Sequence, residues 1–258
     1  MTASTPTDVL NIEIPYPSSA DLSMQLNLGP CRIRLIPTDG PSFVTGTYTD
    51  PTHTLPLDIR TEGGVVTISQ RVELLSFGSI ELPHLELGIN RSRPFACEIR
   101  AGANENTLDL GGLPISRLTL KAGAARFETD FSMPNPTPMS LLEIGMGAGV
   151  FVARHVASAN FSELRLGGGA SATTLDFAGT LQRDAHGRID AGLASVDILI
   201  PSSTSAKVTT KAFAASKSVV GFTGKGDAYY TAPALEGKHP LLELEVSMAF
   251  GSLTLGTT

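Results

Sequence analysis

The chain has 258 residues and a formal net charge of −6, with 41% hydrophobic and only 17% charged residues. This composition excludes a coiled coil and a disordered chain, because there is ample apolar surface to bury and little charge. The acidic balance argues against a surface made to bind phosphate backbones, so we expect no nucleic-acid partner.

Alternation of apolar and polar residues is the dominant pattern. Apolar residues recur at every second position across residues 22–28 near the start and across 242–250 near the end. A period of two predicts strands that bury one face. No stretch of a dozen residues carries a helical apolar stripe, and prolines and glycines interrupt most of them. The sequence therefore predicts an all-β chain.

A repeat runs through the chain after residue 97. Each unit has an apolar residue, two intervening residues, a glycine and a second alternating run. The marker glycines are Gly102, Gly123, Gly147, Gly169 and Gly192, with weaker copies around Gly29 and Gly251. Spacings of 21 to 24 residues are typical of a solenoid, in which each unit buries its face against its neighbours. We predict a β-solenoid resembling a single-stranded β-helix, with coils of about 22 residues. The alternative is a pair of β-sandwiches.

Proline-rich segments at 48–58, 132–140 and 231–241 are predicted to be loops, the second of them inserted between coils. We interpret residues 1–7 as a disordered tail and 8–96 as an N-terminal β region continuous with the solenoid. Residues 97–258 form the repeat solenoid in this interpretation.

The repeats occur in a characteristic order. They read LDLGGLPISRLTLKAGAARFETDF, LLEIGMGAGVFVA, IDAGLASVDILIPSSTSAKVTTKAF, VVGFTGKGDAYYTAP and LELEVSMAFGSLTLG. This series resembles the bacterial toast-rack family, together with related putative-adhesin and LiaF-like cell-envelope response domains. The resemblance covers 97–258 best, while LNLGPCRIRL near the start fits less specifically. It implies a β-solenoid head without an established enzymatic activity, and it supplies no catalytic residues.

Motifs that would indicate catalysis or metal binding are missing from the sequence. There is no G-x-S-x-G elbow, and the five histidines lie at least 31 residues apart, too far for a local zinc pair. Cys31 and Cys97 match no metal spacing, so we expect two buried, reduced thiols, with a disulfide as the alternative. We expect no catalytic residue, no metal and no cofactor.

One set of charged residues recurs at the same place in successive repeats. Seven positions after four of the marker glycines, the chain carries Asp109, Asp130, Arg154 and Asp176. Because their apolar neighbours face inward, we expect these side chains to face outward and to stack across coils about 4.8 Å apart. This column is a candidate binding face for a cation, a sugar or a basic partner. The alternative is a solvated face that discourages edge-to-edge aggregation.

The favoured function is a non-catalytic scaffold or adhesin-like interaction domain with a protein or glycan partner. The alternative that follows from the resemblance is a regulatory head in cell-envelope stress signalling. A polysaccharide-cleaving enzyme is a third reading, and the acidic column would be its only candidate site.

Without a signal peptide or membrane-spanning segment, the sequence as it stands indicates a cytoplasmic location and no direct membrane insertion, with envelope association implied by the resemblance. The apolar strand 242–250 near the C-terminus would expose one face. Therefore we expect either a homo-oligomer or an N-terminal region folded back as a cap.

Overall fold

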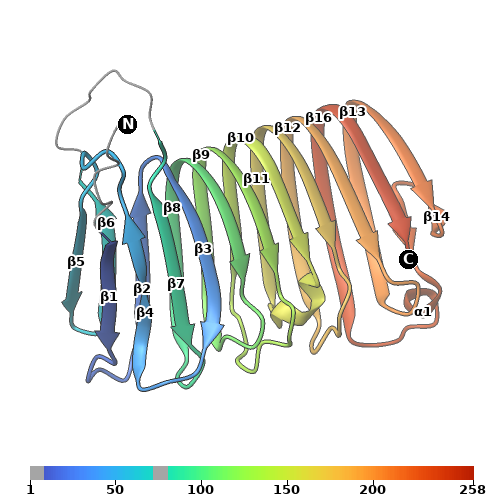
Figure 1. Cartoon of the computed structure of the whole chain (residues 1–258). Helices are drawn as coiled ribbons and strands as arrows, with labels where there is room; N and C mark the ends of the chain where they lie inside the picture. The colour runs from blue at the N-terminus through green and yellow to red at the C-terminus, as the bar shows by residue number, and fades with distance from the viewer. Residues whose placement is uncertain (1–8, 72–80) are drawn as a thin grey trace.

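The computed structural model describes residues 9–71 and 81–258, and it is almost entirely β-structure (Figure 1). Within these residues the helical elements are the 3-10 turn η1 (Val156–Ala159) and the helix α1 (Ala232–Leu235), each of four residues. The predicted all-β solenoid is confirmed. The segment 1–7, expected to be a disordered tail, lies outside the described residues.

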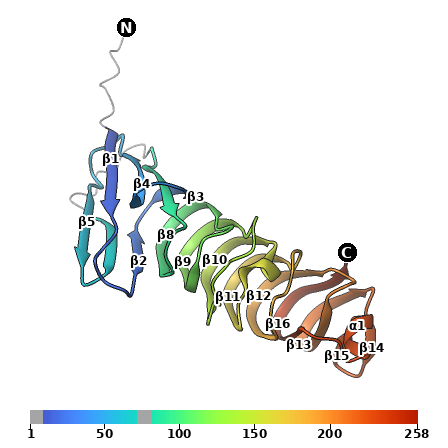
Figure 2. The same ribbon diagram turned by 90° about the horizontal axis from the view of Figure 1, so that it is seen from below.

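Long, bent strands form the coils of the solenoid, and each strand bends near its middle (Figure 2). We call the part before the bend the first arm and the part after it the second arm. The strands are β8 (Phe95–Asp109), β9 (Ile115–Asp130), β10 (Leu142–Arg154), β11 (Glu163–Asp176), β12 (Ala185–Ile200), β13 (Ser205–Val220) and β16 (Leu241–Thr257).

The side chains that face the core change phase at each bend. In β9, Leu118 and Leu120 are buried in the first arm, whereas Phe127 and Thr129 are buried in the second arm. The side chains that face the core are even-numbered before the corner residue Gly123 and odd-numbered after it. This change of phase keeps the apolar side chains inside the coil in both arms. The two arms thereby enclose a continuous core.

Successive coils pair in parallel, with equivalent positions side by side. Leu120 of β9 pairs with Ile144 of β10, and Phe127 pairs with Phe151. The rings of Phe127 and Phe151 lie 6.3 Å apart between centroids inside the core. Each coil therefore stabilises the next by apolar contact as well as by backbone hydrogen bonds.

The N-terminal region continues both sheets of the stack. Strands β2 (Ser23–Leu28) and β3 (Cys31–Thr38) act as the two arms of a first coil around Gly29, and both pair in parallel with β8. Beyond β3 lie β7, β4 and β1, and beyond β2 lie β6 and β5. Their bounds are β1 (Val9–Pro15), β4 (Ser42–Thr49), β5 (Leu57–Glu62), β6 (Val65–Gln70) and β7 (His84–Asn90).

At the C-terminal end, spatial order departs from chain order. Strand β16 inserts between β12 and β13 and pairs in parallel with both. The last coil is therefore β13, whose first arm is extended by the hairpin of β14 (Thr223–Lys225) and β15 (Ala228–Tyr230).

This insertion overturns the expectation that the apolar run 242–250 lies at an open end. Leu242, Leu244, Val246 and Met248 are buried between the two neighbouring coils. The expected N-terminal cap over this run is wrong, because the N-terminal region lies at the opposite end of the stack (Figure 1). The homo-oligomer stays a prediction. The sequence could not reveal the insertion, because β16 carries the same alternation as any other coil strand.

Loops form the third side of the coils. The segment 132–140 joins β9 to β10, and Met139 within it is fully buried and bridges to Phe161. The buried Asn135 side chain donates from Nδ2 to the carbonyls of Ile115, at 2.8 Å, and Ala159, at 3.1 Å. This loop therefore holds neighbouring coils together.

The corner positions explain the marker glycines. A Cβ on Gly147 or Gly169 would come within 2.6 Å of the carbonyl oxygen of the preceding corner glycine. Only a residue without a side chain fits so close to a neighbouring backbone. Gly251 is not in this row of corner glycines. Met248 pairs with Ala191 and Phe250 pairs with Leu193, so the residue opposite the corner residue Gly192 is Ala249. The expected repeat copy at Gly251 is therefore out of register by two residues.

Among the residues that the structure describes, no helix has the length and apolar character needed to cross a membrane.

Candidate binding surface

The outward side chains on the first arms of β8 to β13 form what we call the charged face. Parallel pairing aligns equivalent positions across the strands, so one row runs the width of the stack. In order across the sheet, this row contains Glu98, Thr119, Glu143, Arg165, Arg188, Glu245 and Thr209. A shorter second row contains Glu163, His186, Glu243 and Lys207.

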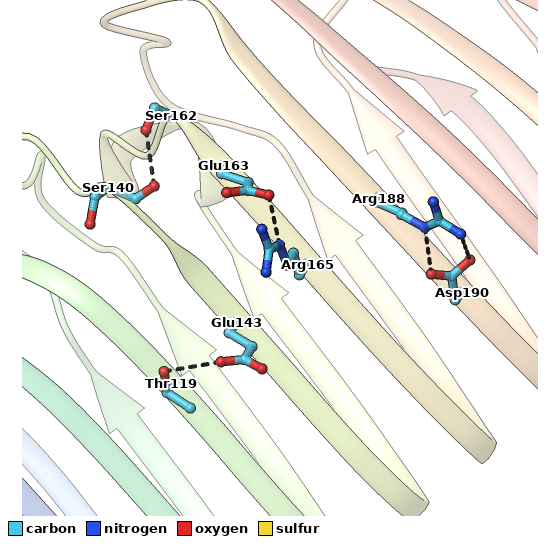
Figure 3. A network of polar contacts seen from close by, with 8 residues as sticks. All are labelled: Thr119, Ser140, Glu143, Ser162, Glu163, Arg165, Arg188 and Asp190. Carbon is cyan, nitrogen blue, oxygen red and sulfur yellow. Dashed lines mark hydrogen bonds and ion pairs between the residues drawn. The ribbon is translucent and has the colours of Figure 1, made fainter.

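Ion pairs along single strands organise this face. Glu163 and Arg165 lie two residues apart on β11 and meet at 2.6 Å, and Arg188 and Asp190 on β12 meet at 2.7 Å (Figure 3). Residues two apart on a strand share a face, which brings opposite charges together without help from another strand. Because the pairs are exposed, they contribute little to stability. Their main effect is to hold donors and acceptors in fixed positions.

A hollow of about 190 Å³ opens in the charged face over β11, β12, β16 and β13. Glu243 lies between two of its lining residues: one carboxylate oxygen is 3.0 Å from Lys207 Nζ and the other is 3.3 Å from His186 Nδ1. The polar side chains that line it are Glu163, His186, Arg188, Lys207, Thr209, Glu243 and Glu245.

Electrostatics in the hollow keep its cations charged. The hydrogen bond to Glu243, followed by its charge, raises the pKa of Lys207 above its usual value. The hydrogen bond to Asp190, followed by the charges of Asp190 and Glu245, raises the pKa of Arg188. The hollow therefore offers fixed donors and acceptors of both signs.

An aromatic residue stands beside Lys207, one of the residues that line the hollow. Tyr230 on β15 pairs in register with Lys207, so the two side chains share a face of the sheet. Lys225 Nζ lies 5.6 Å from the centroid of the Tyr230 ring. The combination of an aromatic ring with charged donors and acceptors suits hydrogen bonding and stacking with a polar ligand.

The column predicted from the sequence lies elsewhere, at the far ends of the second arms. Asp109 pairs with Asp130, and Asp130 pairs with Arg154, so the structure brings these residues side by side. Asp176 occupies the equivalent end of β11.

The carboxylates of this column bond to the turns that follow the strands. Asp109 Oδ1 accepts from the Gly111 amide at 3.0 Å and from Ser132 Oγ at 2.6 Å. Asp176 Oδ1 accepts from the Ala178 amide at 2.9 Å. These contacts give the aspartates a part in closing the coils.

Asp130 contacts a histidine from the turn that follows the next strand. Its Oδ1 lies 2.7 Å from His155 Nδ1. His155 takes a left-handed conformation with φ of 53°, at the start of the turn η1. The turn thus places the histidine beside Asp130.

Cys31 and Cys97 are both buried and unpaired. Burial raises the pKa of each thiol to about 12. The disulfide alternative is therefore wrong for this structure, and the thiols act as small core residues. Among the described residues, no group of three or more His, Cys, Asp or Glu could hold a metal ion.

Comparison with protein families identifies the chain. The sequence profile described as the N-terminal domain of toast_rack, DUF2154, matches residues 3–140, which is 138 of 258 residues. The chain belongs to the toast-rack family. The match includes the start of the chain, where the sequence motifs of this family were least specific, and it overlaps the clearer repeats only across 97–140.

Solved structures were found that are similar to this chain at low sequence identity. A putative cell adhesion protein from Clostridium sporogenes is 12% identical with a TM-score of 0.51, over 98% of this chain and 100% of that one. A putative adhesin from Bacteroides fragilis is 8% identical with a TM-score of 0.40, over 98% and 99% of the two chains. The first likeness shows a shared fold. No curated protein matches the chain.

The charged face was missed in the sequence because its members come from distant strands. Glu243 lies 57 residues from His186 and 36 residues from Lys207 along the chain. One local signal was present: oppositely charged residues two apart recur within strands, as in Glu163 with Arg165. That pattern marks an outward face even where strand order is unknown.

Proposed function

We propose that this toast-rack chain is a non-catalytic, adhesin-like interaction domain that binds an extended polar partner through the charged face. The alignment of donors and acceptors across successive strands carries the proposal. Neighbouring strands lie about 4.8 Å apart, so the rows repeat at a short, regular interval on a rigid sheet. Such a row suits a ligand that is itself extended.

A glycan is the partner that we favour. The hollow has Glu163, Glu243 and Glu245 against Arg188 and Lys207, so its charges nearly balance and it suits a ligand without a large charge. Sugar hydroxyls can take hydrogen bonds from the cations and give them to the carboxylates. The ring of Tyr230 can pack against the apolar side of a sugar ring.

The fold likeness is in line with this proposal, since the Clostridium structure is described as a putative cell adhesion protein. The regulatory head in cell-envelope stress signalling stays as the alternative. It predicts a protein partner in place of a glycan.

Binding of the full chain to a panel of immobilised glycans tests the proposal. The double variant Arg188→Gln with Asp190→Asn removes one ion pair from the charged face. Losing its hydrogen bonds to a ligand should weaken binding about tenfold. The matched control is Arg126→Gln with Glu128→Gln, which removes a similar exposed pair at 2.9 Å from the second arm of β9. The control should bind as the parent does.

If no glycan binds, or if both double variants weaken binding equally, the glycan proposal is wrong. A protein captured from native extract through the charged face, with no glycan bound, would favour the regulatory head.

A further inference from the structure

Three large apolar side chains are exposed on neighbouring strands, at the bends of the coils near the C-terminal end of the stack. Phe213 is 89% exposed, Leu193 65% and Phe250 52%. Leu193 on β12 pairs in register with Phe250 on β16, and Phe250 pairs with Ala214, next to Phe213 on β13. We call these three residues the corner patch.

The corner patch differs from the rest of the corner. At the position of Leu193 and Phe250, the preceding coils carry Ala103, Ala124, Ala148 and Ala170. Small residues suffice to form the bend in those coils. Large side chains on the outside of the bend add nothing to the core, and exposed apolar clusters of this kind mark interaction sites.

Positive charge accompanies the patch. Strand β13 carries Lys207, Lys211 and Lys217 and no acidic residue. Lys211 lies two residues before Phe213, in one row with Asp190 of β12, and Asp190 is already paired with Arg188. Lys207 is already paired with Glu243 in the hollow, and Lys217 Nζ donates to Thr210 Oγ1 at 3.2 Å. The patch therefore presents its apolar side chains beside one lysine, Lys211.

The shape of the patch discriminates between partners. The strands that carry it are bent (Figure 2), and their arms enclose the core, so side chains exposed at the bend lie on its outer, convex side. A stable protein interface buries about 800 Å² on each partner, which three side chains on a convex corner cannot supply, so a second copy is disfavoured. A lipid surface needs no complementary shape, and its headgroup region accepts aromatic rings.

We propose that the corner patch docks on a membrane surface containing anionic lipids, with the three apolar side chains entering the interface and Lys211 facing the headgroups. This surface is separate from the charged face, so neither proposal depends on the other. Docking of this kind requires no segment that spans the bilayer.

Co-sedimentation with vesicles tests this proposal. The parent should bind vesicles of phosphatidylcholine with phosphatidylglycerol more tightly than vesicles of phosphatidylcholine alone. Phe213→Ser should weaken binding by about tenfold or more, because a large apolar side chain no longer leaves water. Lys211→Gln should weaken binding about fivefold, and only with the anionic vesicles.

Met133→Ser is the matched control, because Met133 is 51% exposed and lies on a loop away from the patch. It should bind as the parent does, and thermal melts should show that every variant is folded. The proposal is overturned if the parent binds neither vesicle, or if Phe213→Ser binds as well as the parent. It is also overturned if light scattering shows that Phe213→Ser dissociates an oligomer while vesicles are not bound, since the patch would then be a self-association site.

Discussion

The residues at the bends of the strands are constrained differently in the middle of the stack and at its C-terminal end. At β10, β11 and β12 the corner residues are Gly147, Gly169 and Gly192, and an added Cβ on each would meet a neighbouring carbonyl oxygen within 2.9 Å. At β16 the equivalent position holds Ala249, and on β13 it holds Phe213. Folding dictates the residue in the middle of the stack and leaves the end free. Large exposed side chains at the end therefore need an explanation other than folding.

A second set of glycines is even more constrained. Gly149 and Gly251 have φ of 128° and 121°, and a Cβ on either would lie less than 2 Å from the carbonyl oxygen of Ala125 or Ala194. Each follows a buried methionine by three residues, Met146 or Met248.

The largest effect is expected from Gly149→Ala. Both the backbone conformation and the contact with Ala125 exclude a side chain, so the free energy of unfolding should fall by about 2–5 kcal/mol. Urea denaturation measures this change. Gly167→Ala is the control, because a Cβ there meets nothing within 4 Å, and a similar loss in both variants would contradict the account.

A smaller contrast is expected along the corner row. Gly169→Ala should lower the free energy of unfolding by about 1–3 kcal/mol, because its Cβ would lie 2.6 Å from the oxygen of Gly147. Gly123→Ala should change it by less than about 1 kcal/mol, because the nearest atom is 3.5 Å away. Equal values in the two variants would show that approach between coils does not explain the glycines.

At the C-terminal end the same corner position should be insensitive. Phe213→Ser should change the free energy of unfolding by less than about 0.5 kcal/mol, because the side chain is almost fully exposed. Urea denaturation against the parent checks this. A large loss would mean that Phe213 belongs to the core in solution, and the corner patch would lose its basis.

The smallest effect is expected from the exposed ion pairs. Arg188→Gln with Asp190→Asn should leave the free energy of unfolding nearly unchanged, as should Arg126→Gln with Glu128→Gln, because exposed ion pairs contribute little to stability. Thermal melts of the two double variants should coincide. If only the first variant melts early, its weaker ligand binding would reflect stability and would not locate the charged face.

The repeat was predictable from the sequence because every coil requires the same residue pattern within its own segment of the chain. A corner glycine and two alternating arms recur from Gly102 to Gly192, and each copy carries the pattern without reference to its neighbour. The position of β16 was not predictable in this way. Leu242 to Met248 would fit beside any apolar coil, and only competition among whole strands selects β12 and β13 as partners.

The candidate surfaces depend on that same non-local choice. The hollow joins His186 of β12, Glu243 of β16 and Lys207 of β13, and the corner patch draws on the same three strands. Sequence analysis instead selected Asp109 and its equivalents, because their spacing from the marker glycines can be read directly along the chain.

The role of Lys217 also could not be predicted from the sequence. Lys217 lies on β13, the last coil of the stack, and pairs in register with the apolar residue Leu253 of β16. An inward-facing charge on an edge strand opposes the addition of further strands.

The central claim is that β16 lies between β12 and β13, since both proposed surfaces require it. Paired cysteines test this order directly. Ser195 and Ser252 lie on adjacent strands with their Oγ atoms 3.0 Å apart, whereas Ser216 is one strand further from Ser195. Neighbouring strands lie within reach of a disulfide, and strands about 9.6 Å apart do not.

The measurement is disulfide formation under mild oxidation, followed by mass spectrometry. Cys31 and Cys97 should not interfere, because burial keeps the pKa of both thiols near 12. The account predicts a cross-link in Ser195→Cys with Ser252→Cys and none in Ser195→Cys with Ser216→Cys. The reverse result would place β13 directly beside β12 and would contradict both the hollow and the corner patch.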